Sequence, residues 1–192
     1  MFFDLMGAAI SFLSTYYFIR LNNKAWPIGM IATCLNGWLY WRKGIYADMV
    51  LEFFYFLSMG YGWYIWNHSS YLDKNDSKML LSRLNALQWT VLILVFFSIF
   101  SLIHYVLQTQ IHSNVALLDA TTTSLSLLAQ WLMCHKIIAT WVIWFITDAL
   151  YLFLYHGKNL PFHCLLMMLY SGMAVTGYMI WTKHAKTPQR WM

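Results

Sequence analysis

The chain has 192 residues, of which 60% are hydrophobic, 19% are aromatic and only 10% are charged. A soluble domain has about a quarter charged residues, so this composition excludes a soluble protein and indicates a membrane protein. The formal net charge is +5, but the basic residues are scattered between apolar runs and form no basic stripe, which argues against a nucleic-acid partner.

Seven apolar runs are long enough to cross a bilayer, which takes about 20 helical residues. They leave no room for a soluble domain, so we expect an all-α membrane protein with a single transmembrane domain over residues 1–192. The polar stretch 67–85 is predicted to be a solvated loop. In chain order the runs cover residues 2–19, 26–41, 47–66, 87–107, 115–134, 137–155 and 161–181.

The basic residues favour one orientation of these helices. Nine of the twelve Lys and Arg residues fall on one side of the predicted membrane, and only Arg42, Lys43 and Lys158 fall on the other. Because basic residues near short loops stay on the cytoplasmic side, the N-terminus is predicted outside and the C-terminus in the cytoplasm.

A three-helix repeat becomes visible when the chain is compared with itself at an offset of 115 residues. Two copies of a three-helix unit joined by one inverting helix share the same orientation, which is the 3+1+3 plan of SWEET-like transporters. Repeat one covers residues 1–66, the linking helix 87–107 and repeat two 115–181, and a substrate is expected near the bilayer midplane between the repeats. The rarer matches are Trp26 with Trp141, Lys43 with Lys158, and the motif G-x-x-I-W at 62–66 and 177–181.

Asp148 and Glu52 lie inside predicted membrane helices, where an ionised group costs about 2.5 to 3.5 kcal/mol and usually faces the bundle interior. Steps of three and four residues place Trp141, Trp144 and Asp148 on one face of the sixth helix. Two indoles beside a carboxylate suit a flat cationic ring, which gains about 0.5 to 2 kcal/mol per contact. The alternative is an interfacial aromatic belt, which fits Trp141 but not the deeper Trp144 and Asp148.

Two further helices carry candidate contacts to a ligand. Glu52, Tyr55 and Trp63 share one face of the third helix, where aromatic residues without the carboxylate would indicate packing alone. On the fifth helix, Ser126 and Gln130 belong to a polar line with a spacing of four residues. Hydrogen bonds to neighbouring helices and contacts to a ligand are both open for this line.

Sequence motifs for enzymatic chemistry are absent from the chain. It contains no H-E-x-x-H, Walker A or G-x-S-x-G motif, and its three cysteines show no paired spacing. We therefore expect a transporter without cofactor or metal, and we set it against two rival classes, a membrane enzyme and a structural membrane protein without a ligand.

Several of these segments together resemble the PnuC family of bacterial vitamin transporters, over nearly the whole chain. Each motif alone is moderately specific, but their order and spacing make the resemblance strong. The matching text is W-P-I-G at 26–29, Y-A-D-M at 46–49, E-F-F-Y at 52–55, Y-G-W-Y-x-W at 61–66, T-T-T-x-L-S-x-x-A-Q at 121–130 and W-x-x-W-x-x-x-D at 141–148.

The resemblance implies a seven-helix fold and a homotrimer in the bacterial inner membrane. It also implies energy-independent uptake of a vitamin that a cytoplasmic kinase then traps by phosphorylation. Nicotinamide riboside is the best-known substrate of the family, and similar proteins carry thiamine. Glu52 and Asp148 stand where family members often carry amides, and two carboxylates would also suit thiamine, so both cations are retained as candidate substrates.

Overall fold

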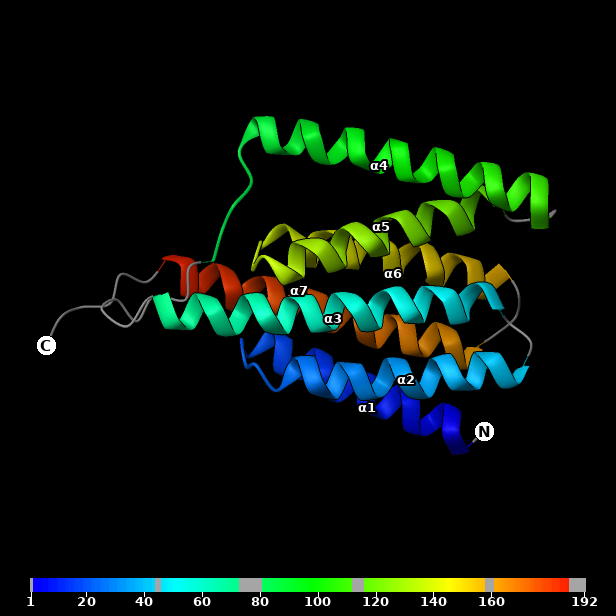
Figure 1. Cartoon of the computed structure of the whole chain (residues 1–192), viewed down its shortest axis with the longest axis horizontal. Helices are drawn as coiled ribbons and strands as arrows, with labels where there is room; N and C mark the ends of the chain where they lie inside the picture. The colour runs from blue at the N-terminus through cyan, green and yellow to red at the C-terminus, as the bar shows by residue number, and fades with distance from the viewer. Residues whose placement is uncertain (1, 44–45, 73–80, 112–115, 158–160, 187–192) are drawn as a thin grey trace, which may run out of the picture. The chain divides into compact units, whose positions relative to one another are not determined.

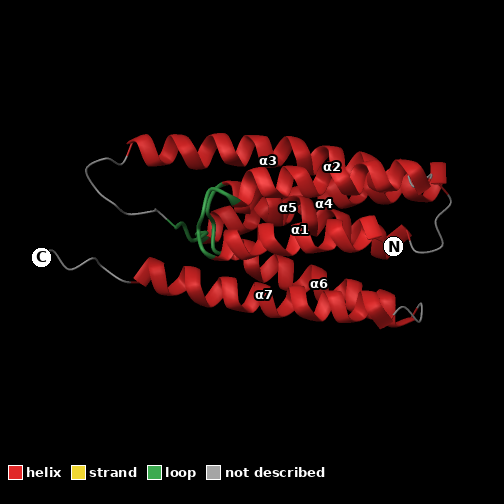
Figure 2. Cartoon of the chain, turned by 90° about the horizontal axis from the view of Figure 1, so that it is seen from below, coloured by secondary structure: helices red, strands yellow, loops and turns green. Residues whose placement is uncertain are grey.

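The computed structural model describes residues 2–43, 46–72, 81–111, 116–157 and 161–186, and all regular elements in these ranges are helices (Figure 2). Seven are α-helices, and the eighth is a short π-helix that directly follows the fourth. In chain order they are α1 (Phe2–Ile19), α2 (Ala25–Lys43), α3 (Tyr46–Leu72), α4 (Ala86–Val106), η1 (Leu107–Ile111), α5 (Ala116–Cys134), α6 (Ala139–Gly157) and α7 (Pro161–Lys186).

The seven α-helices confirm the seven predicted helical segments, with one clear correction. The loop predicted over residues 67–85 is wrong in its first part, because α3 continues six residues past Trp66 to Leu72. Four of these six residues are polar, but none is a glycine or proline that would end a helix. Residues 73–80 lie outside the described ranges, and α4 then begins at a capping box between Asn85 and Gln88.

Two helical stretches of the described chain, Ala86–Thr109 and Cys164–Ala185, are by themselves long and apolar enough to cross a membrane. Shorter apolar helical stretches cover Leu5–Ile19 and Ala139–Phe153. The first of these candidate spans has no buried residue, which is the pattern of a helix that faces lipid or another chain.

The chain divides into two compact units. Unit 1 comprises Met1–Leu81, Met133–Lys136 and Met179–Met192, and within it α2 packs against both α1 and α3 (Figure 1). Gly62 of α3 lies against the Trp26 indole of α2, where any Cβ atom would overlap the ring. This close approach of α2 to α3 therefore requires glycine at position 62.

Unit 2 comprises Ser82–Leu132 and Ile137–Tyr178. Its buried cluster contains Ala129 and Leu132 of α5 and Ile143 of α6, and Leu92 of α4 packs against this cluster. In Figure 1, α4 runs alongside α5. No described residue of α4 is buried, so α4 adds a covering helix to the unit without contributing to its core.

The contact between an indole and a glycine recurs in unit 2. Gly177 of α7 lies against the Trp141 indole of α6, and a Cβ atom there would overlap the ring as at Gly62. Trp26 and Trp141, like Gly62 and Gly177, are separated by the offset of 115 residues that the sequence comparison found. The two matching motifs thus make the same contact in each unit.

The helices α1 and α5 also end in the same way. Leu21 and Lys136, which are again 115 residues apart, have φ angles of 52° and 56°. The Leu21 amide donates to the Phe18 carbonyl at 3.0 Å, and the Lys136 amide donates to the Met133 carbonyl at 3.1 Å. This is a Schellman ending, usually made by glycine, and a left-handed residue with a side chain costs about 1 to 2 kcal/mol. The second bond of each ending runs from Asn22 to Tyr17 and from Ile137 to Leu132, both at 3.0 Å.

The contact of Gly62 with Trp26 predicts an asymmetry between two glycines of α3. Gly62→Ala should destabilise the purified protein by about 1 to 3 kcal/mol, because the new methyl group overlaps the indole. Gly60→Ala is the matched control, since a methyl group there would meet nothing within 4 Å and alanine favours the helix. Thermal unfolding in detergent measures both, and an equal melting temperature for the two variants would contradict the assignment.

Candidate functional site

Asp148 of α6 is the most distinctive polar residue of unit 2. It is 7% exposed, and it makes no hydrogen bond or ion pair with any residue that the structure describes. Within the described part of unit 2 the only Lys or Arg is Arg83, an exposed residue that precedes α4. A buried carboxylate without a counter-charge is unfavourable, so Asp148 is the best candidate to hold a cation.

The two tryptophans predicted to flank Asp148 have different surroundings. Trp144 is half-buried and packs against the cluster formed by Ala129, Leu132 and Ile143. Trp141 is 2% exposed and covers Gly177, so it lies inside unit 2, and the alternative of an interfacial aromatic belt is wrong for this residue. Trp144 is therefore the more accessible of the two rings for a ligand.

The polar line predicted on α5 is buried in unit 2. Thr122, Ser126 and Gln130 are each at most 5% exposed. The Thr122 hydroxyl donates within its own helix, to the Leu118 carbonyl at 3.0 Å. The Ser126 hydroxyl makes no hydrogen bond with any described residue, so it can donate to a ligand.

A buried hydrogen bond fixes how α5 and α6 lie against each other. The Thr140 hydroxyl donates to the Ala129 carbonyl at 2.7 Å, and the chain between the two helices is short. In an antiparallel pair with this register, Trp144 lies near the level of Ser126 and Asp148 lies near the level of Thr122. Sequence reasoning missed Thr140, although its side chain is fully buried. Unit 2 thus places a carboxylate, a hydroxyl and an indole along one pair of helices.

The predicted residues of α3 belong to unit 1. Glu52 and Tyr55 are half-buried, and Gly37 of α2 faces Glu52, since a Cβ atom there would lie 3.5 Å from the Glu52 Cβ. Trp63 shares their helix face but is 42% exposed. Eleven residues of helix separate it from Glu52, which is about 16 Å. The structure therefore does not bring Trp63 next to Glu52.

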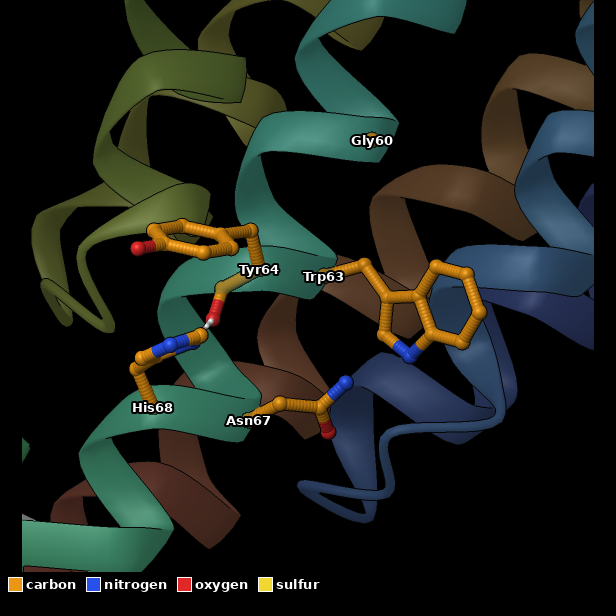
Figure 3. A pocket seen from close by; sticks show the side chains of 5 residues that line it. All are labelled: Gly60, Trp63, Tyr64, Asn67 and His68. Carbon is orange, nitrogen blue, oxygen red and sulfur yellow. Dashed lines mark hydrogen bonds between the residues drawn. The ribbon is translucent and has the colours of Figure 1, made fainter.

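Trp63 instead lines an open groove of about 220 Å³ on α3 (Figure 3). The Asn67 side chain accepts a hydrogen bond from Asn23 at 2.7 Å, and the His68 ring lies 3.1 Å from the Tyr64 carbonyl. The groove is lined by Gly60, Trp63, Tyr64, Asn67 and His68, all of α3 and without Lys, Arg, Asp or Glu. Among the described residues no group of three His, Cys, Asp or Glu side chains could hold a metal ion.

Sequence reasoning also missed the partners of two buried tryptophans in unit 1. The Trp66 indole donates to the carbonyls of Met133 at 3.2 Å and Cys134 at 3.1 Å. The Trp181 indole donates to the Phe18 carbonyl at 3.1 Å. The matching G-x-x-I-W motifs identified both tryptophans, but nothing in the sequence identified their backbone acceptors.

Lys136 lies beside one of these indoles. Its ammonium is 5.2 Å from the centre of the Trp66 ring, and the residue is only 5% exposed. Burial lowers the pKa of Lys136. The ring offers a cation–π contact that partly offsets this burial.

Comparison with known proteins identifies relatives over nearly the whole chain. A family model described as "Nicotinamide mononucleotide transporter" matches residues 1–183. The nicotinamide riboside transporter PnuC of Escherichia coli (strain K12) is 21% identical over 203 residues, which cover 93% of this chain and 80% of that protein. The protein of the same name from Shigella flexneri matches to the same extent. A solved structure, "Crystal structure of the Vitamin B3 transporter PnuC", has a TM-score of 0.77 at 21% identity and covers 96% of this chain and 82% of that chain, which shows the fold.

The bond between Thr140 and Ala129 predicts a loss of stability. Thr140→Val keeps the shape of the side chain but removes the buried donor, so unfolding should become easier by about 1 kcal/mol. Thr176→Val is the control, because the Thr176 hydroxyl donates to the Gly172 carbonyl on an exposed face of α7. Thermal unfolding of both variants should show a lower midpoint for Thr140→Val alone.

Proposed function

Because the chain belongs to the nicotinamide mononucleotide transporter family, we propose that it carries nicotinamide riboside, a cationic vitamin precursor, into the cell. It is a membrane transporter and not an enzyme, since the family model and the relatives describe transporters. The observation that carries the choice of substrate is Asp148, a buried carboxylate without a described partner. The pyridinium ring of the riboside supplies the missing positive charge.

The charges of unit 2 favour the riboside over the mononucleotide. The mononucleotide differs by a phosphate group, which needs basic partners, and the described part of unit 2 offers only the exposed Arg83. A phosphate would also be repelled by Asp148. Phosphorylation of the riboside by a cytoplasmic kinase would therefore produce a compound that the carrier does not return, and uptake can proceed by facilitated diffusion without energy input.

We assign specific contacts to the residues of α5 and α6. Asp148 is the counter-ion of the pyridinium ring, and Trp144, with Trp141 behind it, provides the aromatic wall. Ser126 and Gln130 hydrogen-bond the ribose hydroxyls or the carboxamide, for which the free Ser126 hydroxyl is suited.

Glu52, Tyr55 and Trp63 of α3 are proposed as further substrate contacts. The support for Glu52 and Tyr55 is their shared, half-buried helix face and the cost of a carboxylate at membrane depth. Trp63 has the weaker support, because it lies about 16 Å along the helix and lines an exposed groove.

The larger organisation is proposed as two parallel three-helix repeats, 1–66 and 115–181, joined by the helix 87–107. The matched contacts of Gly62 with Trp26 and of Gly177 with Trp141 support this plan, as do the matched endings of α1 and α5. A homotrimer with the N-terminus outside and the C-terminus in the cytoplasm completes the proposal. No described residue of α4 is buried, so α4 is the described helix best suited to a subunit contact.

Thiamine is the second candidate substrate, and the two carboxylates favour it. Its thiazolium ring is a cation that Asp148 can hold, and its aminopyrimidine can donate to a second carboxylate such as Glu52. If thiamine is the substrate, Glu52→Gln should weaken its binding, and unchanged affinity would remove the chemical reason for this alternative.

Transport by proteoliposomes tests the proposed function directly. Vesicles that contain only this protein should equilibrate labelled nicotinamide riboside down its gradient without ATP and without chemical change. A site built on specific hydrogen bonds rejects poor analogues by large factors, so unlabelled riboside should compete while thiamine and nicotinamide mononucleotide should not. A chemically altered product would indicate a membrane enzyme, and the absence of saturable transport would indicate a protein without this ligand.

The role of Asp148 is tested by a matched pair of variants. Asp148→Asn should weaken riboside binding about 30-fold or more, because losing one partner of a desolvated charge pair costs about 2 to 5 kcal/mol. Asp119→Asn, in the first turn of α5, removes an acidic charge at a helix start and should change affinity little. Calorimetric titration measures both affinities, and equal small effects would overturn the assignment of Asp148.

A further inference from the structure

The indole hydrogen bonds of unit 1 form a matched pair. The Trp66 indole donates to the Met133 carbonyl, and the Trp181 indole donates to the Phe18 carbonyl. Both the donors and the acceptors are separated by 115 residues, the offset of the proposed repeats. Trp66 of repeat one therefore donates to repeat two, and Trp181 of repeat two donates to repeat one. We call these two indole–carbonyl contacts the latch.

The surroundings of the latch are buried and aromatic. Trp66 and Trp181 are fully buried, and their ring centres are 6.2 Å apart. Phe18 and Trp26 pack edge-on against Trp66, with ring centres 5.9 and 5.3 Å away. An indole N–H that is fully buried among aromatic rings needs its acceptor, because leaving a buried donor unsatisfied is energetically costly. The two indole hydrogen bonds are therefore expected to break only when the packing around them also opens.

The acceptors of the latch lie at strained helix ends. The Phe18 carbonyl also accepts a hydrogen bond from the Leu21 amide, and the Met133 carbonyl accepts one from the Lys136 amide. Leu21 and Lys136 are the two described non-glycine residues with a positive φ angle. Strained backbone at two equivalent positions is typical of parts of a protein that change conformation.

We propose that the latch closes one end of the transporter and that both indole hydrogen bonds break each time this end opens. The proposal rests on the division into two repeats given above, and it is independent of which vitamin is carried. In carriers built from repeats, access alternates when one repeat moves against the other. Both bonds cross between the repeats, so movement at this end must separate Trp66 from Met133 and Trp181 from Phe18.

Cys134 provides a natural reporter of the latch. It is fully buried, its carbonyl accepts from Trp66, and its thiol lies 3.4 Å from the Ser58 carbonyl. The other two cysteines are Cys34, which is exposed, and Cys164, which is partly exposed. Replacing both by alanine in the full-length chain leaves Cys134 as the only thiol, which reacts with a maleimide only when the latch opens.

The test measures the rate at which a water-soluble maleimide labels Cys134 in reconstituted protein. Trp66→Phe and Trp181→Phe keep an aromatic ring but remove the donor, and each should raise the labelling rate about 2- to 10-fold. Two variants on opposite sides of the latch are used so that poor folding of one leaves the other to decide. Only variants that elute from size exclusion like the parent protein are compared.

Trp26→Phe is the matched control. Trp26 is equally buried and touches the same aromatic cluster, but its indole nitrogen has no hydrogen-bond acceptor among the described residues. It should leave the labelling rate unchanged. Parent-like rates in Trp66→Phe and Trp181→Phe, or an equal rise in Trp26→Phe, would overturn the latch. Transport of nicotinamide riboside is measured in the same vesicles, so failure of the proposed substrate is seen separately from failure of the latch.

Discussion

A helix that ends inside a bundle leaves carbonyl groups without a donor from the next turn, and the core of unit 1 depends on how these groups are satisfied. At the end of α1 the Phe18 carbonyl accepts two hydrogen bonds, one from the amide of the following turn and one from a tryptophan indole, and the Met133 carbonyl does the same at the end of α5. This arrangement buries two large rings with their N–H groups paired. It also fixes where α3 and α7 can lie, because Trp66 and Trp181 must reach those carbonyls.

The positions of the helices could be predicted from the sequence because a spanning helix needs about 20 consecutive, predominantly apolar residues. The helix boundaries were harder to predict, since a helix can continue beyond its apolar run into more polar sequence, as α3 does to Leu72. The offset of 115 residues was also visible. The structural reason for this offset could not be predicted. Trp26 and Trp141 each pack against a glycine that lies 36 residues further along the chain, and the sequence alone does not reveal that contact.

Residues of the candidate site could be predicted from the sequence where a single residue is unusual by itself. Asp148 is an acid within a predicted membrane helix, and the structure buries it without a described partner. Trp63 shows the limit of periodicity, because a shared helix face does not make residues three turns apart neighbours. The partners of Trp66 and Trp181 lie 67 and 163 residues away and are backbone carbonyls, which every residue possesses. No side-chain pattern could have revealed them.

The two proposed repeats share contacts that hold their helices together, but they differ at Glu52 and Asp148, the two acids of the candidate site. Ser14 donates to the Ala25 carbonyl, and at the positions 115 residues later Thr140 donates to the Ala129 carbonyl. The same two positions are therefore in contact in both copies, but the donor lies on the first helix in one copy and on the second helix in the other. Asp148 corresponds to Thr33, whose hydroxyl donates to its own helix at Met30, and Glu52 corresponds to Met167. Each acid therefore stands in only one of the two proposed repeats, whereas the helix contacts stand in both. This is the pattern expected of side chains that serve a bound ligand and not the fold, because an ionisable group inside a membrane helix is costly unless function requires it.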